Sequence, residues 1–243
     1  MTSALGTRRK WRWAAAAAGA AAVLAVGVPF LYTNFVADDA PAPLVGADGP
    51  SAAAPAATAT TGAGAAAGTG DDSGRWQVTT GSQAGYRVKE ILLGQDTEAV
   101  GRTSSVSGQA TVEGGRVTAG TFTVDLTTVQ SDQDRRDAQF HRRIMDTATY
   151  PTASFKLGRP IDVAAVAAGG AGGTVKATGD LTLHGTTRPV TVDLSVKRTG
   201  DTIRVGGSIP VTFADWNIPN PSFGPVSTDD HGQIEFLLVL AHA

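Results

Sequence analysis

Apolar and polar side chains alternate along much of the second half of the chain. In residues 190–197, valine and leucine occupy every second position, and threonine, aspartate, serine and lysine lie between them. A period of two is typical of a β-strand with one buried face and one wet face. Residues 175–183, 203–213 and 153–157 repeat the pattern. The chain therefore predicts a sheet of amphipathic strands.

Two segments depart from simple alternation. The apolar positions change parity between Val117 and Phe122, so a one-residue β-bulge is predicted at Gly120, where the change occurs. Residues 234–240 include consecutive apolar positions, which predicts a strand covered on both faces. Together with shorter runs and glycine turns upstream, the pattern indicates about eight antiparallel strands. They are expected to close into a barrel, although a two-sheet sandwich fits the same periods.

One short helix interrupts the predicted strands. Ser131 or Asp132 is a suitable N-cap for a helix that runs to about Asp146, and Phe140 and Ile144 fall one turn apart on one side of it. We expect this helix to close one end of the sheet.

The N-terminal region predicts a transmembrane helix. Residues 14–36 carry no charge and follow a segment with three arginines and one lysine. A helix of that length rises about 35 Å, enough to cross a hydrocarbon core of about 30 Å. The basic flank places residues 1–13 in the cytoplasm and the rest of the chain outside it. A cleaved signal peptide is the alternative, but Phe35 fits poorly before a cleavage site at Ala37.

Residues 37–74 predict a disordered linker. Of these 38 residues, 31 are Ala, Gly, Pro, Ser or Thr, and the only larger apolar side chains are Leu44 and Val45. Such a segment buries too little surface to offset its chain entropy. The folded domain is then expected over residues 75–243, tethered by a coil with a root-mean-square span of about 35 Å.

Composition and short motifs narrow the possible functions. Twenty basic against 22 acidic residues give a net charge of −2, which provides no basic field for nucleic acid. The absence of cysteine excludes disulfides, thiolate metal sites and a cysteine nucleophile. Ser104, Ser105 and Ser107 lack a Gly-x-Ser-x-Gly frame, so a hydrolase on apolar substrates is only a weak alternative. His231 lies beside two aspartates without the spacing of a metal site, and we expect neither metal nor cofactor.

Three runs of residues carry a family resemblance. Residues 179–191 have the sequence Gly-Asp-Leu-Thr-Leu-His-Gly-Thr-Thr-Arg-Pro-Val-Thr, which closely resembles the central motif of the YceI-like domain family. Arg-Asp at 136–137, Tyr-Pro-Thr-Ala-Ser-Phe at 150–155 and Val-Asp-Leu at 124–126 resemble its helix region and the strands beside it. The likeness covers nearly all of the predicted domain. One departure is Gln139, where the family often has histidine.

The resemblance implies both a fold and a ligand class. Proteins of this family are extended, lipocalin-like antiparallel β-barrels, exported in bacteria, which hold a long isoprenoid chain in an apolar tunnel. Their ligand class is polyprenyl pyrophosphates and isoprenoid quinones. The resemblance implies a binding or carrier protein and brings no catalytic residues. Many members are free in the periplasm, whereas this chain is expected to be tethered.

The apolar sides of the strands supply the candidate tunnel lining. In a hollow barrel these side chains contact the ligand, and affinity comes mainly from apolar area at about 25 cal/mol per Å². In a solid barrel the same residues form the packed core, because both interiors share one period. The candidates are Phe122, Val124, Phe155, Leu157, Leu181, Leu183, Val192 and Leu194.

Four basic residues are candidates for binding a head group. Arg136, Arg142 and Arg143 can hold a pyrophosphate by charge-assisted bonds, and His184 precedes a tight turn. A solvated helix face and a histidine bonded to turn backbone are the alternatives. We therefore expect a membrane-tethered, extracytoplasmic barrel that binds an isoprenoid lipid or quinone. The alternative is an envelope module with a solid core that binds another protein through the loop at 216–226.

Overall fold

Eight antiparallel strands close into an elongated barrel. The computed structural model describes residues 40–44, 72–92, 94–168, 172–224 and 226–243. In spatial order the closed wall consists of β1 (Gly74–Val78), β4 (Val106–Glu113), β5 (Arg116–Asp125), β6 (Thr152–Leu157), β8 (Gly173–Leu183), β9 (Thr186–Thr199), β10 (Thr202–Thr212) and β12 (His231–His242). Pairing of β1 with β12 closes this ring. The predicted barrel is confirmed, and the sandwich alternative is wrong.

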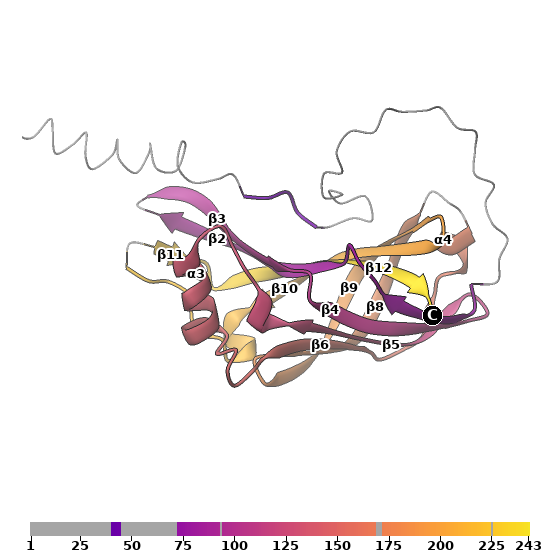
Figure 1. Cartoon of the computed structure of the whole chain (residues 1–243). Coiled ribbons are helices and arrows are strands. Elements are labelled where there is room, and N and C mark those ends of the chain that lie inside the picture. Colours follow the sequence, from indigo (N-terminus) through magenta and orange to yellow (C-terminus); the bar gives the residue numbers. More distant parts are fainter. Residues whose placement is uncertain (1–39, 45–71, 93, 169–171, 225) are drawn as a thin grey trace, which may run out of the picture.

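A second pair of strands extends the barrel beyond the closed ring. β2 (Gln83–Leu92) pairs with β3 (Gln95–Thr103) and with the first half of β12, while β1 pairs with the second half. The remaining described elements are η2 (Leu126–Thr128), α3 (Asp134–Gln139), η3 (Phe140–Ile144), β7 (Ile161–Asp162), α4 (Ala164–Ala168), η4 (Phe213–Trp216) and β11 (Val226–Thr228). Figure 1 shows α3 and β11 at one end of the barrel and α4 and the C-terminus at the other.

The predicted β-bulge is present, two residues from the predicted position. Consecutive residues of β4 pair with Ala119 and Val117 of β5, which leaves Thr118 without a partner in the ladder. The extra residue allows both Val117 and Gly120 to face the barrel interior, where both line a cavity. The change in the parity of the apolar positions does reflect a β-bulge, as predicted. The bulged residue is Thr118, however, and Gly120 faces inward.

The helical segment is shorter and less regular than expected. α3 is followed directly by one π-helical turn, η3, in which the N–H of Met145 donates to the carbonyl of Phe140 at 2.8 Å. Gln133 precedes the helix and makes no side-chain cap, so the predicted cap at Ser131 or Asp132 is wrong. Ser131 instead donates through its hydroxyl to Asp137 at 2.7 Å. The segment lies at one end of the barrel, as predicted (Figure 1).

Part of the predicted linker lies against the barrel. Residues 40–44 contact the outer side of β2, β3 and β12, and Leu44 is only 1% exposed. This differs from the expectation of a free coil through residues 37–74. The predicted transmembrane helix at 14–36 lies outside the described residues. Among the residues that the structure describes, no helix is long and apolar enough to cross a membrane.

Candidate functional site

The barrel contains a partly open apolar cavity of about 180 Å³. It lies around Phe155, Leu181 and Leu194, and we call it the large chamber. The wall comes from side chains on the inner faces of the closed ring, because alternate residues of each strand point inward. Apolar cavities of about 150 Å³ stay dry and bind small apolar molecules. The interior is therefore hollow, and the solid core assumed by the alternative function is wrong.

A second cavity of about 130 Å³ adjoins the first near α3. It lies around Tyr86, Phe140 and Leu183, and we call it the small chamber. Four residues line both chambers and so lie between them: Ala84, Val124, Ala153 and Ile234. Two of the four are alanines, which leave more room than the longer side chains around them. The two chambers therefore follow one another along the barrel.

All eight predicted lining residues face one of the two chambers. Seven line the large chamber: Phe122, Val124, Phe155, Leu157, Leu181, Val192 and Leu194. Leu183 lines the small chamber instead. Their contact with a ligand stays a prediction.

β10 and β12 contribute lining residues that are not among the eight predicted ones. The clearest examples are Ile203, Val205, Ile209, Phe236, Leu238 and Leu240. The period-two pattern of residues 203–213 could have identified those of β10. In β12 the consecutive apolar residues hide which side faces inward, so the pattern gave no such signal.

The wall of the small chamber includes polar side chains. Tyr86 stacks on Phe140 with 5.1 Å between ring centroids, and Glu90 and Arg136 also line this chamber. The guanidinium of Arg136 lies 3.8 Å from the carboxylate of Glu90 and also pairs with Asp132. Burial raises the pKa of Glu90, although Arg136 opposes the shift. Burial likewise raises the pKa of Tyr86, so its phenol stays protonated and can donate a hydrogen bond.

The other three head-group candidates line neither chamber. Arg142 is exposed to solvent. Arg143 donates from Nη2 to the carbonyl of Pro221 at 2.7 Å and so fastens the proline-rich loop to the helix. His184 occupies a left-handed turn position, with its Nδ1 3.3 Å from the carbonyl of Trp216. The structure brings only Arg136, of the four, to the cavity.

Comparison with known families accounts for this architecture. A family model of the YceI-like domain matches residues 76–240. The chain belongs to the YceI-like domain family. The match spans the closed ring, both chambers and the helix at their end.

Individual relatives of this YceI-like chain are distant. The UPF0312 protein VPA0850 of Vibrio parahaemolyticus serotype O3:K6 is 27% identical over 150 residues, which are 58% of this chain and 75% of that protein. A polyisoprenoid binding domain from Saccharophagus degradans, implicated in plant cell wall breakdown, has 22% identity and a TM-score of 0.57, covering 71% of this chain and 100% of that one. BcnA of Burkholderia cenocepacia has 24% identity and a TM-score of 0.48, covering 63% of this chain and 95% of that one. The Saccharophagus likeness shows a shared fold.

The far end of the large chamber of this YceI-like barrel has its own polar pair. Asp72 and Arg198 both line the chamber and form an ion pair, and Trp76 donates from Nε1 to the carbonyl of Asp72 at 2.9 Å. No local sequence pattern indicates this pair, because its members lie 126 residues apart. The apolar interior is thus bounded by an ion pair near each end.

The histidine considered for metal binding is the exposed first residue of β12, directly after the bend at Asp230. Nδ1 of His231 is 2.8 Å from a carboxylate oxygen of Asp230, and Nε2 is 4.0 Å from one of Asp229. Within the described ranges, no group of three or more metal-ligating side chains comes together. The arrangement is that of a local turn contact.

Proposed function

We propose that this YceI-like protein binds a long isoprenoid lipid or isoprenoid quinone in its barrel and acts as a carrier, without catalysis. The observation that supports this most directly is the hollow apolar interior of two adjoining chambers. A slender chain fits two chambers in series better than a compact ligand does. The Saccharophagus neighbour, a polyisoprenoid binding domain of the same fold, also supports it.

The size of the cavities indicates why a ligand would bind. The two chambers have volumes of about 180 and 130 Å³, and their walls are almost wholly apolar. Domains of this size are stable by only about 5–15 kcal/mol. An apolar chain that fills the space restores the missing van der Waals contacts and removes its own surface from water. Binding should therefore stabilise the fold strongly.

The charges around the small chamber favour a quinone over a pyrophosphate. Arg136 is already balanced by Glu90 and Asp132, so it offers little net positive charge to an anionic head group. A quinone ring is uncharged and presents carbonyl oxygens that accept hydrogen bonds. The protonated phenol of Tyr86 and the guanidinium of Arg136 are donors at the chamber wall. We therefore place the quinone ring in the small chamber and its isoprenoid tail in the large one.

Loading of the purified full chain tests the proposal. The chain is incubated separately with a long-chain isoprenoid quinone, a polyprenyl pyrophosphate of similar length and a quinone without a tail, and bound ligand is measured by native mass spectrometry. We expect the long-chain quinone to bind best and the tailless quinone not to be retained. Failure of both isoprenoids to load would contradict the carrier proposal. Preference for the pyrophosphate would contradict only the assignment of the head group.

We further propose that the protein lies outside the cytoplasm, held to the membrane by residues 14–36. This part rests on the sequence, namely the uncharged run after a basic segment. Fusion of a reporter that is active only outside the cytoplasm to the C-terminus tests the orientation. An inactive reporter, with the fusion protein present at normal levels, would contradict it.

A further inference from the structure

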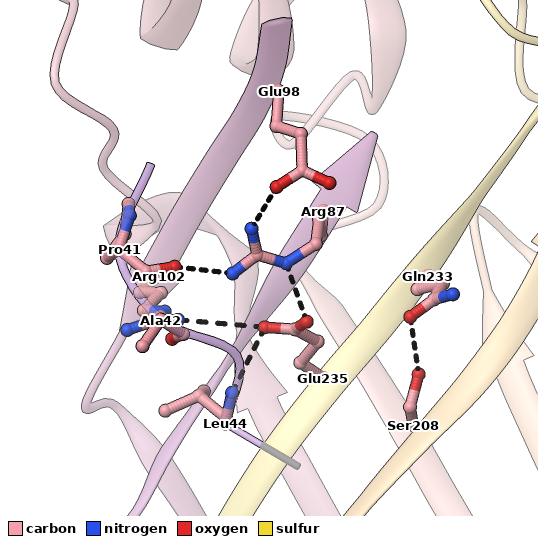
Figure 2. Close-up of polar contacts among 9 residues, drawn as sticks. All are labelled: Pro41, Ala42, Leu44, Arg87, Glu98, Arg102, Ser208, Gln233 and Glu235. Carbon is pink, nitrogen blue, oxygen red and sulfur yellow. Dashed lines mark hydrogen bonds and ion pairs between the residues drawn. The ribbon is translucent and has the colours of Figure 1, made fainter. Parts of the chain in front are cut away.

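An ionic cluster centred on a buried glutamate lies on the outer face of the barrel wall, and none of its members lines either chamber. Arg87 of β2 donates from Nε to Glu235 of β12 at 2.8 Å and from Nη1 to Glu98 of β3 at 2.5 Å. Nη2 of Arg102, on β3, lies 3.6 Å from the other oxygen of Glu235. Glu235 is only 2% exposed, so the two arginines are the groups that balance its charge. Figure 2 shows these side chains converging from three strands.

Gly85 makes this convergence possible. It lies on β2 between its ladder partners Glu235 and Arg102. A Cβ at Gly85 would lie 3.0 Å from Cγ of Arg102 and 2.1 Å from the carbonyl oxygen of Gly101. Because position 85 carries no side chain, Arg102 can extend across β2 to reach Glu235.

The cluster binds the backbone of the 40–44 segment (Figure 2). Arg87 donates from Nη2 to the carbonyl of Pro41 at 2.5 Å, and Arg102 donates from Nη2 to the carbonyl of Ala42. The N–H of Leu44 donates to Oε2 of Glu235 at 3.3 Å. The four residues before Leu44 are exposed, whereas Leu44 itself is 1% exposed. Recognition therefore uses three backbone groups and one leucine side chain.

The sequence of the segment, Ala-Pro-Ala-Pro-Leu, suits this kind of binding. Each proline fixes its own φ and biases the residue before it toward an extended conformation. An extended segment with two prolines loses little chain entropy when it docks. The prolines also carry no N–H, so docking leaves no proline donor unsatisfied.

We propose that the outer face of β2, β3 and β12 is a peptide-docking groove whose occupant is this chain's own 40–44 segment, bound in cis as a latch. The docked latch fixes the position of residue 40, to which the first 39 residues are joined, on the barrel. It thereby sets how the barrel is oriented relative to whatever holds the N-terminus. Release of the latch joins residues 40–44 to the following linker and gives the barrel a longer tether.

The chain segment that follows the latch favours docking of the latch on its own barrel (in cis) over docking on the barrel of a second copy. Residues 45–71 can extend about 90 Å, far enough to join Leu44 to Asp72 without strain. A covalent connection of this length gives an effective concentration of about 1 mM, above that of ordinary protein solutions. The latch does not depend on a ligand in the chambers, so it can be tested separately from the carrier function.

Two introduced cysteines in the full chain test the latch, because the natural chain contains none. Spin labels are attached at Ala40→Cys and Lys89→Cys, both exposed positions, and their separation is measured by pulsed electron paramagnetic resonance. We expect one narrow distance. Adding Leu44→Ser removes the buried side chain and should lower the docked population by roughly tenfold or more, broadening the distribution. Ala42→Ser is the matched control, since only the carbonyl of Ala42 is used.

A broad distribution in the parent chain, or a narrow one that persists with Leu44→Ser, would overturn the latch. Chains labelled only at Ala40→Cys are also mixed with chains labelled only at Lys89→Cys. A short distance in that mixture would assign the groove to a second copy and overturn binding in cis.

A free peptide tests the groove directly. Acetylated Ala-Pro-Ala-Pro-Leu amide is added to the Leu44→Ser chain, and the Nε–H signals of Arg87 and Arg102 are followed by nuclear magnetic resonance. We expect these signals to shift, and a peptide ending in serine to leave them unchanged. Equal responses to both peptides, or none to either, would overturn recognition through the leucine.

Discussion

The two faces of β12 bury side chains in opposite ways. On the inner face, Ile234, Phe236 and Leu238 line apolar chambers that the protein's own atoms do not fill. On the outer face, Glu235 is enclosed by arginines and by the chain's own 40–44 segment. Apolar contact is non-directional, so an empty apolar space accepts many chain conformations of a ligand. A buried charge needs partners in fixed directions, and here the chain itself supplies them.

This contrast predicts that substitutions on the two faces of β12 affect stability and ligand binding to different extents. Loss of packing around a cavity is spread over many weak contacts, whereas loss of one partner leaves a buried charge uncompensated. The largest effects on stability are therefore expected on the outer face, and the largest effects on ligand binding on the inner face.

Glu235→Ala is expected to give the largest loss of stability. It leaves Arg87 and Arg102 without their shared carboxylate, and breaking a buried pair in this way costs about 3–5 kcal/mol. The free energy of unfolding is measured by urea denaturation of the full chain. Glu98→Ala is the matched control, because the Glu98 side chain is 36% exposed and its loss should cost at most about 1 kcal/mol. Equal losses would show that burial of Glu235 is not what matters.

Filling the chambers is expected to give the next largest effect, in the stabilising direction. A long-chain isoprenoid quinone at about 100 times its Kd should raise the free energy of unfolding by about 2.7 kcal/mol. The melting temperature of the full chain is compared with and without this quinone. A quinone lacking the isoprenoid tail is the control and should leave the melting temperature nearly unchanged. Equal shifts would indicate that the apolar chambers do not provide the affinity.

Ala153→Phe is expected to separate the two chambers. Ala153 lines both chambers, and a phenyl ring there would fill space between them. Loading of a long-chain quinone should fall by roughly tenfold, which corresponds to about 1.4 kcal/mol. Ala119→Phe on the neighbouring strand is the control, because Ala119 is exposed. Unchanged loading with a folded Ala153→Phe barrel would contradict a ligand that spans both chambers.

The sequence predicted the inner face better than the outer face, for a physical reason. Period-two alternation is local, so it identified Leu181 and Val192 as inward-facing without any knowledge of their partners. It could not show that the interior is hollow, because packed and empty barrels share that period. The outer cluster joins Leu44 to Glu235 across 191 residues and Arg87 to Glu235 across 148, and no local pattern signals either contact. The composition of residues 37–74 likewise gives no sign that Leu44 docks against the barrel.

The head-group candidates show the same limit. Four basic residues are head-group candidates because of their charge and their position in the chain, but only Arg136 lines a chamber. Arg143 binds the carbonyl of Pro221, a contact across 78 residues, and His184 lies beside Trp216, 32 residues away. The long-range packing that decides where a cationic side chain points does not appear in the spacing of charges along one helix.

Glu90→Gln is expected to have the smallest effect on stability. The size of this effect should depend on pH, because Glu90 is a partly buried carboxylate in the wall of an apolar chamber. Burial raises the pKa of Glu90, with Arg136 opposing, so the folded state binds this proton more tightly than the unfolded state does. The stability that Glu90 contributes is therefore fully present below its unfolded pKa and is lost as pH rises through its folded pKa. Glu90→Gln should then be more stable than the parent chain at pH 7, and the gain should vanish near pH 4, where the parent carboxyl is about half protonated even when unfolded.

Unfolding free energies of both chains, measured across that pH range, test this dependence. A gain that stays constant with pH would mean that the substitution acts through packing and not through the charge of Glu90. The same variant also sharpens the assignment of the head group, because it removes a negative charge that balances Arg136. Loading of a polyprenyl pyrophosphate should therefore improve in Glu90→Gln, while loading of the uncharged quinone should change little. Improvement of both ligands alike would contradict this assignment, because the carboxylate and the amide hardly differ in volume and only an anionic head group should respond to the lost charge.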